Sequence, residues 1–107
     1  TQTTVPKIDL TITISVIVAL AESTILYKRT IFENYLKCTG RCVKYSDPES
    51  LKEYGEYYFL ALTYAPNNIG SLMIKINSAI SHAHFDQATE LFEEQAAPLI
   101  STMLKNM

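Results

Sequence analysis

The amino-acid sequence predicts an all-α fold, a compact bundle of four helices whose last helix is kinked near Pro98. Two observations predict it. Apolar side chains recur at helical three- and four-residue spacing along most of the chain, and capping residues and prolines mark helix ends. The chain has 107 residues, 48% of them hydrophobic, which is enough to bury a core. We therefore expect one helical domain over residues 1–107.

The first helix is predicted over residues 10–37. Asp9 precedes it as an N-cap, and Gly40 is expected to stop it. An apolar stripe at helical spacing comprises Leu10, Ile14, Ile17, Ala21, Ile25, Phe32 and Leu36.

Residues 8–18 allow a second interpretation. Apolar, mostly β-branched residues stand at every second position of this run, which is also the pattern of a strand. The alternative fold is therefore α+β with an N-terminal strand at 8–18. We favour the helix, because a strand needs partners and only 43–45 and 57–64 offer weak ones.

The second helix is predicted from Pro48 to about Tyr64. Ser46 and Asp47 precede a proline at the first helical position, and Pro66 ends the helix. Its polar stripe is narrow, and four of the seven tyrosines of the chain lie in it. An apolar surface this wide indicates a helix that is central or covered by another molecule.

Two faces of the second helix receive different roles. Tyr54 and Tyr58 lie one turn apart and are assigned to the core with Leu51 and Leu62. A different face is assigned to a dimer or partner contact, and its partner-binding residues are Tyr57, Leu60 and Tyr64, beside Ala61.

The third and fourth helices are predicted after Asn67-Asn68 and from Asp86 to about Lys105. The core stripe of the third is Ile69, Leu72, Met73, Ile76, Ile80 and Ala83. The inward residues of the fourth are Ala88, Leu91, Phe92, Leu99, Ile100 and Met103. Pro98 removes a backbone donor and clashes one turn back, so a kink or break is expected at 94–98.

No residue pattern predicts catalysis, a cofactor or a metal. Cys38, Cys42, His82 and His84 are the possible metal ligands, but their spacing is unlike that of zinc sites. Acidic residues from Asp86 onward are explained by the helix dipole. The chain lacks a nucleophile elbow and a glycine-rich phosphate loop. We expect a protein that is not an enzyme.

Charge and cysteine content limit the partners and the compartment. The net charge is −2, and the basic cluster Lys37, Arg41 and Lys44 is too small for the footprint of a nucleic-acid-binding protein. The apolar run at 10–18 is shorter than the ~20 residues of a membrane span. Two cysteines favour a cytoplasmic protein with free thiols. The alternative is an exported protein with a disulfide between Cys38 and Cys42.

These observations favour a non-enzymatic protein–protein interaction module of the adaptor, regulator, chaperone or inhibitor type, acting through the tyrosine-rich helix face. We expect a homodimer that binds another protein. Two alternatives remain: a helical module that binds a small molecule or lipid in an aromatic-lined pocket, and, with less support, an accessory nucleic-acid-binding protein.

Overall fold

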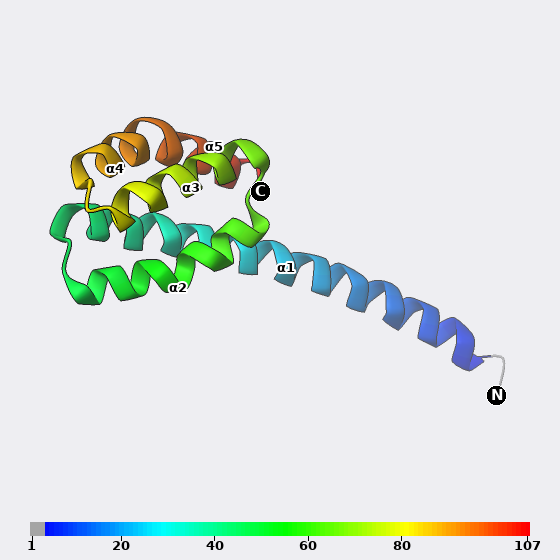
Figure 1. The fold of residues 1–107 in the computed structure, drawn as a ribbon. Coiled ribbons are helices and arrows are strands. Elements are labelled where there is room, and N and C mark those ends of the chain that lie inside the picture. Colours follow the sequence, from blue (N-terminus) through cyan, green and yellow to red (C-terminus); the bar gives the residue numbers. More distant parts are fainter. Residues whose placement is uncertain (1–3) are drawn as a thin grey trace.

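The fold is all-α, as predicted. The computed structural model describes the backbone of residues 4–107 and the side chains of residues 15, 16 and 18–107. Its elements are α1 (Thr4–Tyr45), α2 (Pro48–Tyr64), α3 (Asn67–Ser81), α4 (Phe85–Leu91), the π-helical turn η1 (Phe92–Ala96) and α5 (Ala97–Lys105). Since α4, η1 and α5 follow one another without a break, the fold has four helices (Figure 1).

The strand alternative at 8–18 is wrong. The backbone of these residues is helical, and no strand occurs anywhere within residues 4–107. Residues 43–45 and 57–64, the only partners a strand could have found, are helical as well. In the absence of a partner strand, the backbone groups of this run pair with one another in helix α1.

Helix α1 exceeds its predicted bounds at both ends. Asp9 lies inside the helix rather than at its N-cap, and Gly40 does not stop it. Glycine costs only about 1 kcal/mol in a helix interior. A Cβ at Gly40 would lie 3.8 Å from the Phe92 ring, so this position is packed against η1. The helix ends instead where Ser46 adopts a φ of 56°.

The bounds of α2 agree with the prediction, and α3 begins at Asn67, two residues before its predicted start. Asp47 has the extended backbone of an N-cap before Pro48, although its side chain makes no capping hydrogen bond. Helix α3 ends in a Schellman motif, in which His84 N–H donates to Ala79 O (2.8 Å) and Ala83 N–H donates to Ile80 O (3.0 Å). The assignment of Ala83 to the core is wrong, because this exposed residue holds the left-handed position of the motif at a φ of 57°.

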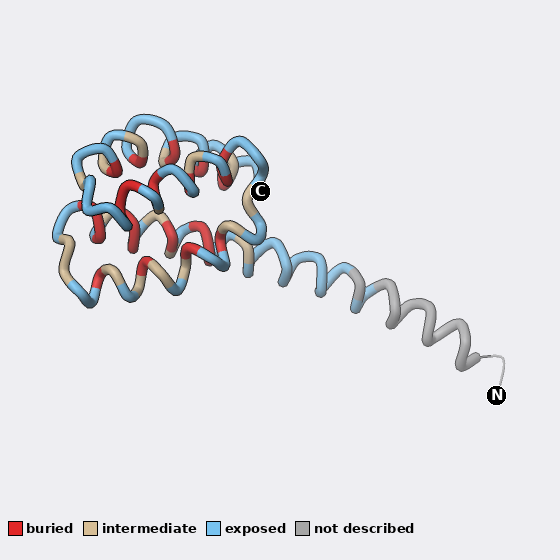
Figure 2. Tube along the Cα trace, in the orientation of Figure 1, coloured by how far each residue is buried: buried red, intermediate tan, exposed pale blue. Residues whose placement is uncertain are grey.

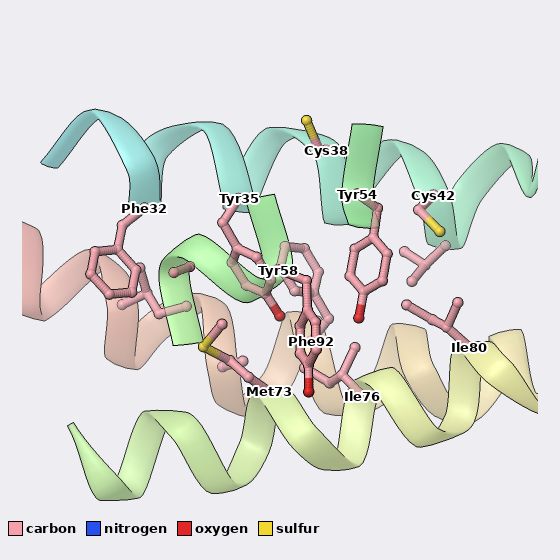
Figure 3. Packing of buried hydrophobic residues seen from close by; sticks show 14 of the residues in the cluster. Phe32, Tyr35, Cys38, Cys42, Tyr54, Tyr58, Met73, Ile76, Ile80 and Phe92 are labelled. Carbon is pink, nitrogen blue, oxygen red and sulfur yellow. The ribbon is translucent and has the colours of Figure 1, made fainter. Parts of the chain in front are cut away.

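A core of side chains from every element lies between α1 and α2 on one side and α3, α4, η1 and α5 on the other (Figure 3). It includes Phe32, Tyr35, Cys38, Cys42, Tyr54, Tyr58, Met73, Ile76, Ile80 and Phe92. The prediction that Tyr54 and Tyr58 belong to the core is therefore confirmed.

The predicted irregularity before Pro98 takes the form of η1. Ala97 N–H donates to the carbonyl of Phe92, five residues back, and Pro98 has no N–H to donate to Glu94. The additional residue of the π turn rotates α5 by about 100° relative to α4. Buried positions consequently recur every four residues: Ala88, Phe92, Ala96, Ile100 and Leu104.

This rotation explains why Leu99 is exposed and not in the core. The prediction that Leu99 faces inward is wrong: a continuous α-helix would place it near Ala88, but the π turn moves it outward, where it is 39% exposed. Leu104 takes a buried position instead.

Half of α1 extends beyond the bundle. Its C-terminal half packs against α2, α4 and α5, while its N-terminal half projects away from them (Figure 1). The Cα radius of gyration is 19.1 Å, against about 13 Å for a compact domain of this length. The described side chains before residue 28 are all exposed (Figure 2).

Candidate protein-interaction surface

The predicted partner-binding residues lie on α2 beside α1, at different degrees of exposure. Leu60 and Tyr64 are 41% and 40% exposed. Tyr57 is half-buried and packs against the core. The structure therefore leaves Leu60 and Tyr64 available to another molecule, and Tyr57 only in part.

Tyr64 contacts α1 at the point where that helix leaves the bundle. Its ring meets the ring of Tyr27 edge to face, with centroids 6.2 Å apart and an interplanar angle of 87°. The Nζ atom of Lys28 lies 5.3 Å from the Tyr64 centroid. Each contact is worth about 0.5–1 kcal/mol at a partly exposed site. Together they favour one orientation of the Tyr64 ring on the surface.

Sequence reasoning missed Tyr27, which is 52% exposed. The signal was present, because α1 and α2 are antiparallel helices joined by the two-residue connection 46–47. Residues at similar distances from this connection, such as 27 and 64, must lie close together. We call Tyr27, Leu60 and Tyr64 the boundary surface.

The other end of the α1–α2 boundary is polar. An Arg41 guanidinium N–H donates to Glu53 Oε2 at 3.2 Å, and Cys38 Sγ lies 3.9 Å from the same oxygen. Burial raises the pKa of the Cys38 thiol, and the nearby Glu53 carboxylate raises it further. The thiol is thus protonated and protected at neutral pH.

A second apolar area lies on the part of α1 outside the bundle. We call residues 4–27 the projecting segment. Its exposed large apolar side chains, among those described, are Val16, Val18, Leu20, Ile25, Leu26 and Tyr27. The ranges 4–14 and 17, which carry Leu10, Ile14 and Ile17 of the predicted stripe, lie outside the described side chains. Tyr27, the last residue of the projecting segment, is also part of the boundary surface.

Three tyrosines form a buried cluster beneath the boundary. Tyr54 stacks on Tyr58 with centroids 5.7 Å apart and lies 6.3 Å from Tyr35. The Tyr54 hydroxyl donates to Asn77 Oδ1 at 2.8 Å, which ties α2 to α3. Burial raises the pKa of all three phenols. They stay neutral and act as core residues.

The remaining polar groups do not form a recognisable chemical centre. The rings of His82 and His84 lie 6.1 Å apart on the surface, beside an open hollow that Lys75 also lines. Among the described side chains, no three potential metal ligands gather. Cys38 and Cys42 are both buried and free. They stand one turn apart on α1, where Cβ atoms lie about 5–6 Å apart, too far for a disulfide without distortion of the helix.

Among the residues that the structure describes, no helix has the length and apolar character to cross a membrane. Comparison of the chain with protein-family models, curated proteins and solved structures found no match.

Proposed function

We propose that this protein is a non-enzymatic protein–protein interaction module that binds a partner protein through the boundary surface. The observation that carries this proposal is the exposure of Tyr27, Leu60 and Tyr64 side by side on two helices. Tyrosine is enriched in protein interfaces, where its ring is buried and its hydroxyl reaches water or a partner.

The packing of the boundary surface supports binding without a large conformational change. Tyr27 and Tyr64 already hold each other, and the α2 backbone beneath them is fixed by the buried residues Tyr58 and Ala61. Rigid aromatic side chains lose little conformational entropy on binding. A partner with a mainly apolar groove that also offers hydrogen-bonding groups to the tyrosine hydroxyls would fit this surface.

A pocket for a small molecule or lipid has less support. Tyr35, Tyr54 and Tyr58 pack against one another in the core rather than around a cavity. Three surface hollows of about 580, 550 and 360 Å³ are open to solvent, and no tyrosine lines any of them. Native mass spectrometry of protein from its host would reveal a retained ligand if this alternative were correct.

Affinity capture from the native host tests the proposed function. The bait is the full chain, as wild type, as Leu60→Glu and as the control Ile74→Glu. Ile74 is an apolar residue of α3 with 55% exposure. We expect a protein that wild type and Ile74→Glu capture and that Leu60→Glu loses, because the new carboxylate would be buried at the interface.

The same far-UV helicity in all three baits would show that the comparison reports binding and not folding. Equal capture by Leu60→Glu and wild type would contradict the assignment of the boundary surface.

A further inference from the structure

We propose that the projecting segment is covered by the projecting segment of a second copy of this chain, packed antiparallel as a twofold dimer. This inference goes beyond the proposed function, because it concerns a different surface and a different occupant. The boundary surface stays free for another protein in this arrangement, apart from Tyr27 at the junction.

The core-facing stripe of α1 continues past the end of the bundle. Within the bundle its fully buried members are Phe32, Tyr35, Thr39 and Cys42, at alternating spacings of three and four residues. The same spacing extends backward through Lys28 to Ile25, Ala21 and Val18, where no other helix of the chain covers it. This spacing is the seam by which helices pack side by side. The uncovered part of the seam therefore fits another helix.

The exposed area is large enough for a specific interface at this seam. The accessible surface of the chain is 7212 Å². A compact protein of 12.1 kDa has about 6,000 Å², so the excess is about 1,200 Å². Burying half of this excess on each of two copies would remove about 1,200 Å² in total, the lower bound for a specific interface.

An isolated helix of this kind also lacks support in water. Short helices are marginal when nothing packs on them, and β-branched residues such as Val16 and Val18 add to the cost. A second copy supplies a helix of the same length and the same seam. Twofold symmetry closes the assembly at two chains, so the seam itself is not left open to form fibres.

The positions of the charged residues and the bulk of the two bundles favour the antiparallel arrangement. Parallel pairing would place Lys28 and Arg29 beside the same residues of the second copy, and both bundles at the same end. Antiparallel pairing centred near residue 16 places the bundles at opposite ends and separates these cations. It also pairs the stretch 10–21, which has no charged residue, with itself.

Sedimentation equilibrium of the full chain tests whether a second copy covers the projecting segment. Wild type should have twice the monomer mass of 12.1 kDa. Val18→Glu should weaken the dimer about a hundredfold or more, because it buries a carboxylate in the seam. Ile74→Glu is the control, since Ile74 and Val18 are 55% and 51% exposed. Leu60→Glu should also leave the dimer intact, which separates this test from that of the proposed function.

Cysteine trapping tests the orientation. Val18→Cys should be joined to its own copy by a short bismaleimide cross-linker, because Val18 lies on the seam and its two copies would lie about 6 Å apart along the helices. Ile25→Cys, on the same seam, should not be joined, because its two copies would lie about 27 Å apart along the helices. Wild type is the background, since Cys38 and Cys42 are buried. Trapping at both positions would contradict the antiparallel arrangement.

Three results would overturn the proposal. One is a monomeric wild type at high micromolar concentration. Another is a dimer that Val18→Glu does not weaken. The third is a monomer that floats with phosphatidylcholine vesicles, because a lipid surface would then be the occupant.

Discussion

Two buried tyrosines differ in their hydroxyl groups. Tyr54 donates to Asn77, whereas the Tyr35 hydroxyl makes no hydrogen bond of good geometry among the described residues and has only a weak polar interaction with the Thr39 side chain. We expect Tyr54→Phe to lower the free energy of unfolding by about 1 kcal/mol. Tyr35→Phe should leave it unchanged or raise it slightly, because a buried hydroxyl without a hydrogen bond of good geometry is unfavourable. Urea denaturation of both variants measures the difference, and equal losses would show that Tyr35 is also paired.

The buried thiols and phenols predict a loss of stability at high pH. Burial raises the pKa values of Cys38, Cys42, Tyr35, Tyr54 and Tyr58 in the folded protein. The unfolded chain therefore releases these protons at lower pH than the folded chain does. The free energy of unfolding should be insensitive to these groups below about pH 8 and should fall above it. Urea denaturation at several pH values above about 8 measures the free energy of unfolding, and tyrosinate absorbance reports the ionised phenols. A free energy of unfolding that rises with pH would contradict this prediction.

Thiol labelling tests the state of the two cysteines directly. A colorimetric thiol reagent should react with neither cysteine in the folded protein, because both are buried. Both should react after denaturation without a reductant. Protection that persists in denaturant would instead indicate a disulfide between Cys38 and Cys42.

At the scale of single elements, η1 has the clearest consequence for stability, because it rotates α5 and so decides which of its leucines is buried. Leu99 and Leu104 have the same side chain, but Leu99 is 39% exposed and Leu104 is 8% exposed. Leu104→Ala should cost about 2–5 kcal/mol of unfolding free energy and Leu99→Ala less than about 1 kcal/mol. Thermal and urea denaturation give both values. The reverse order would show that the helix keeps an uninterrupted α register.

Local signals could predict some features of the elements but not others. Asp47, Pro48 and Pro66 act on the neighbouring backbone through fixed φ angles and capping, so the bounds of α2 could be predicted from sequence. Gly40 and Leu99 depend on packing between distant elements, which local patterns do not contain. Spacing could place Leu60 and Tyr64 on one face of α2, but only the register between α1 and α2 adds Tyr27.

At the scale of the whole molecule, four helices could be predicted, but the projecting segment could not. Periodicity shows that residues 18–25 continue the stripe of Phe32, and it does not show where the bundle ends. The bundle ends near Tyr64, the last residue of α2, because α2 has only 17 residues and α1 has 42. The difference in length leaves the described part of α1 before Tyr27 exposed, with no helix of the same chain alongside it.

Amide hydrogen exchange along α1 tests most directly whether a second copy covers the projecting segment. Residues 31–43 within the bundle serve as the reference, and residues 18–27 are compared at low and high protein concentration. Dimerisation predicts that protection at 18–27 increases with concentration and is lost in Val18→Glu, while the reference residues stay protected in both. Exchange at 18–27 at the rate of an unstructured peptide, at every concentration, would contradict it.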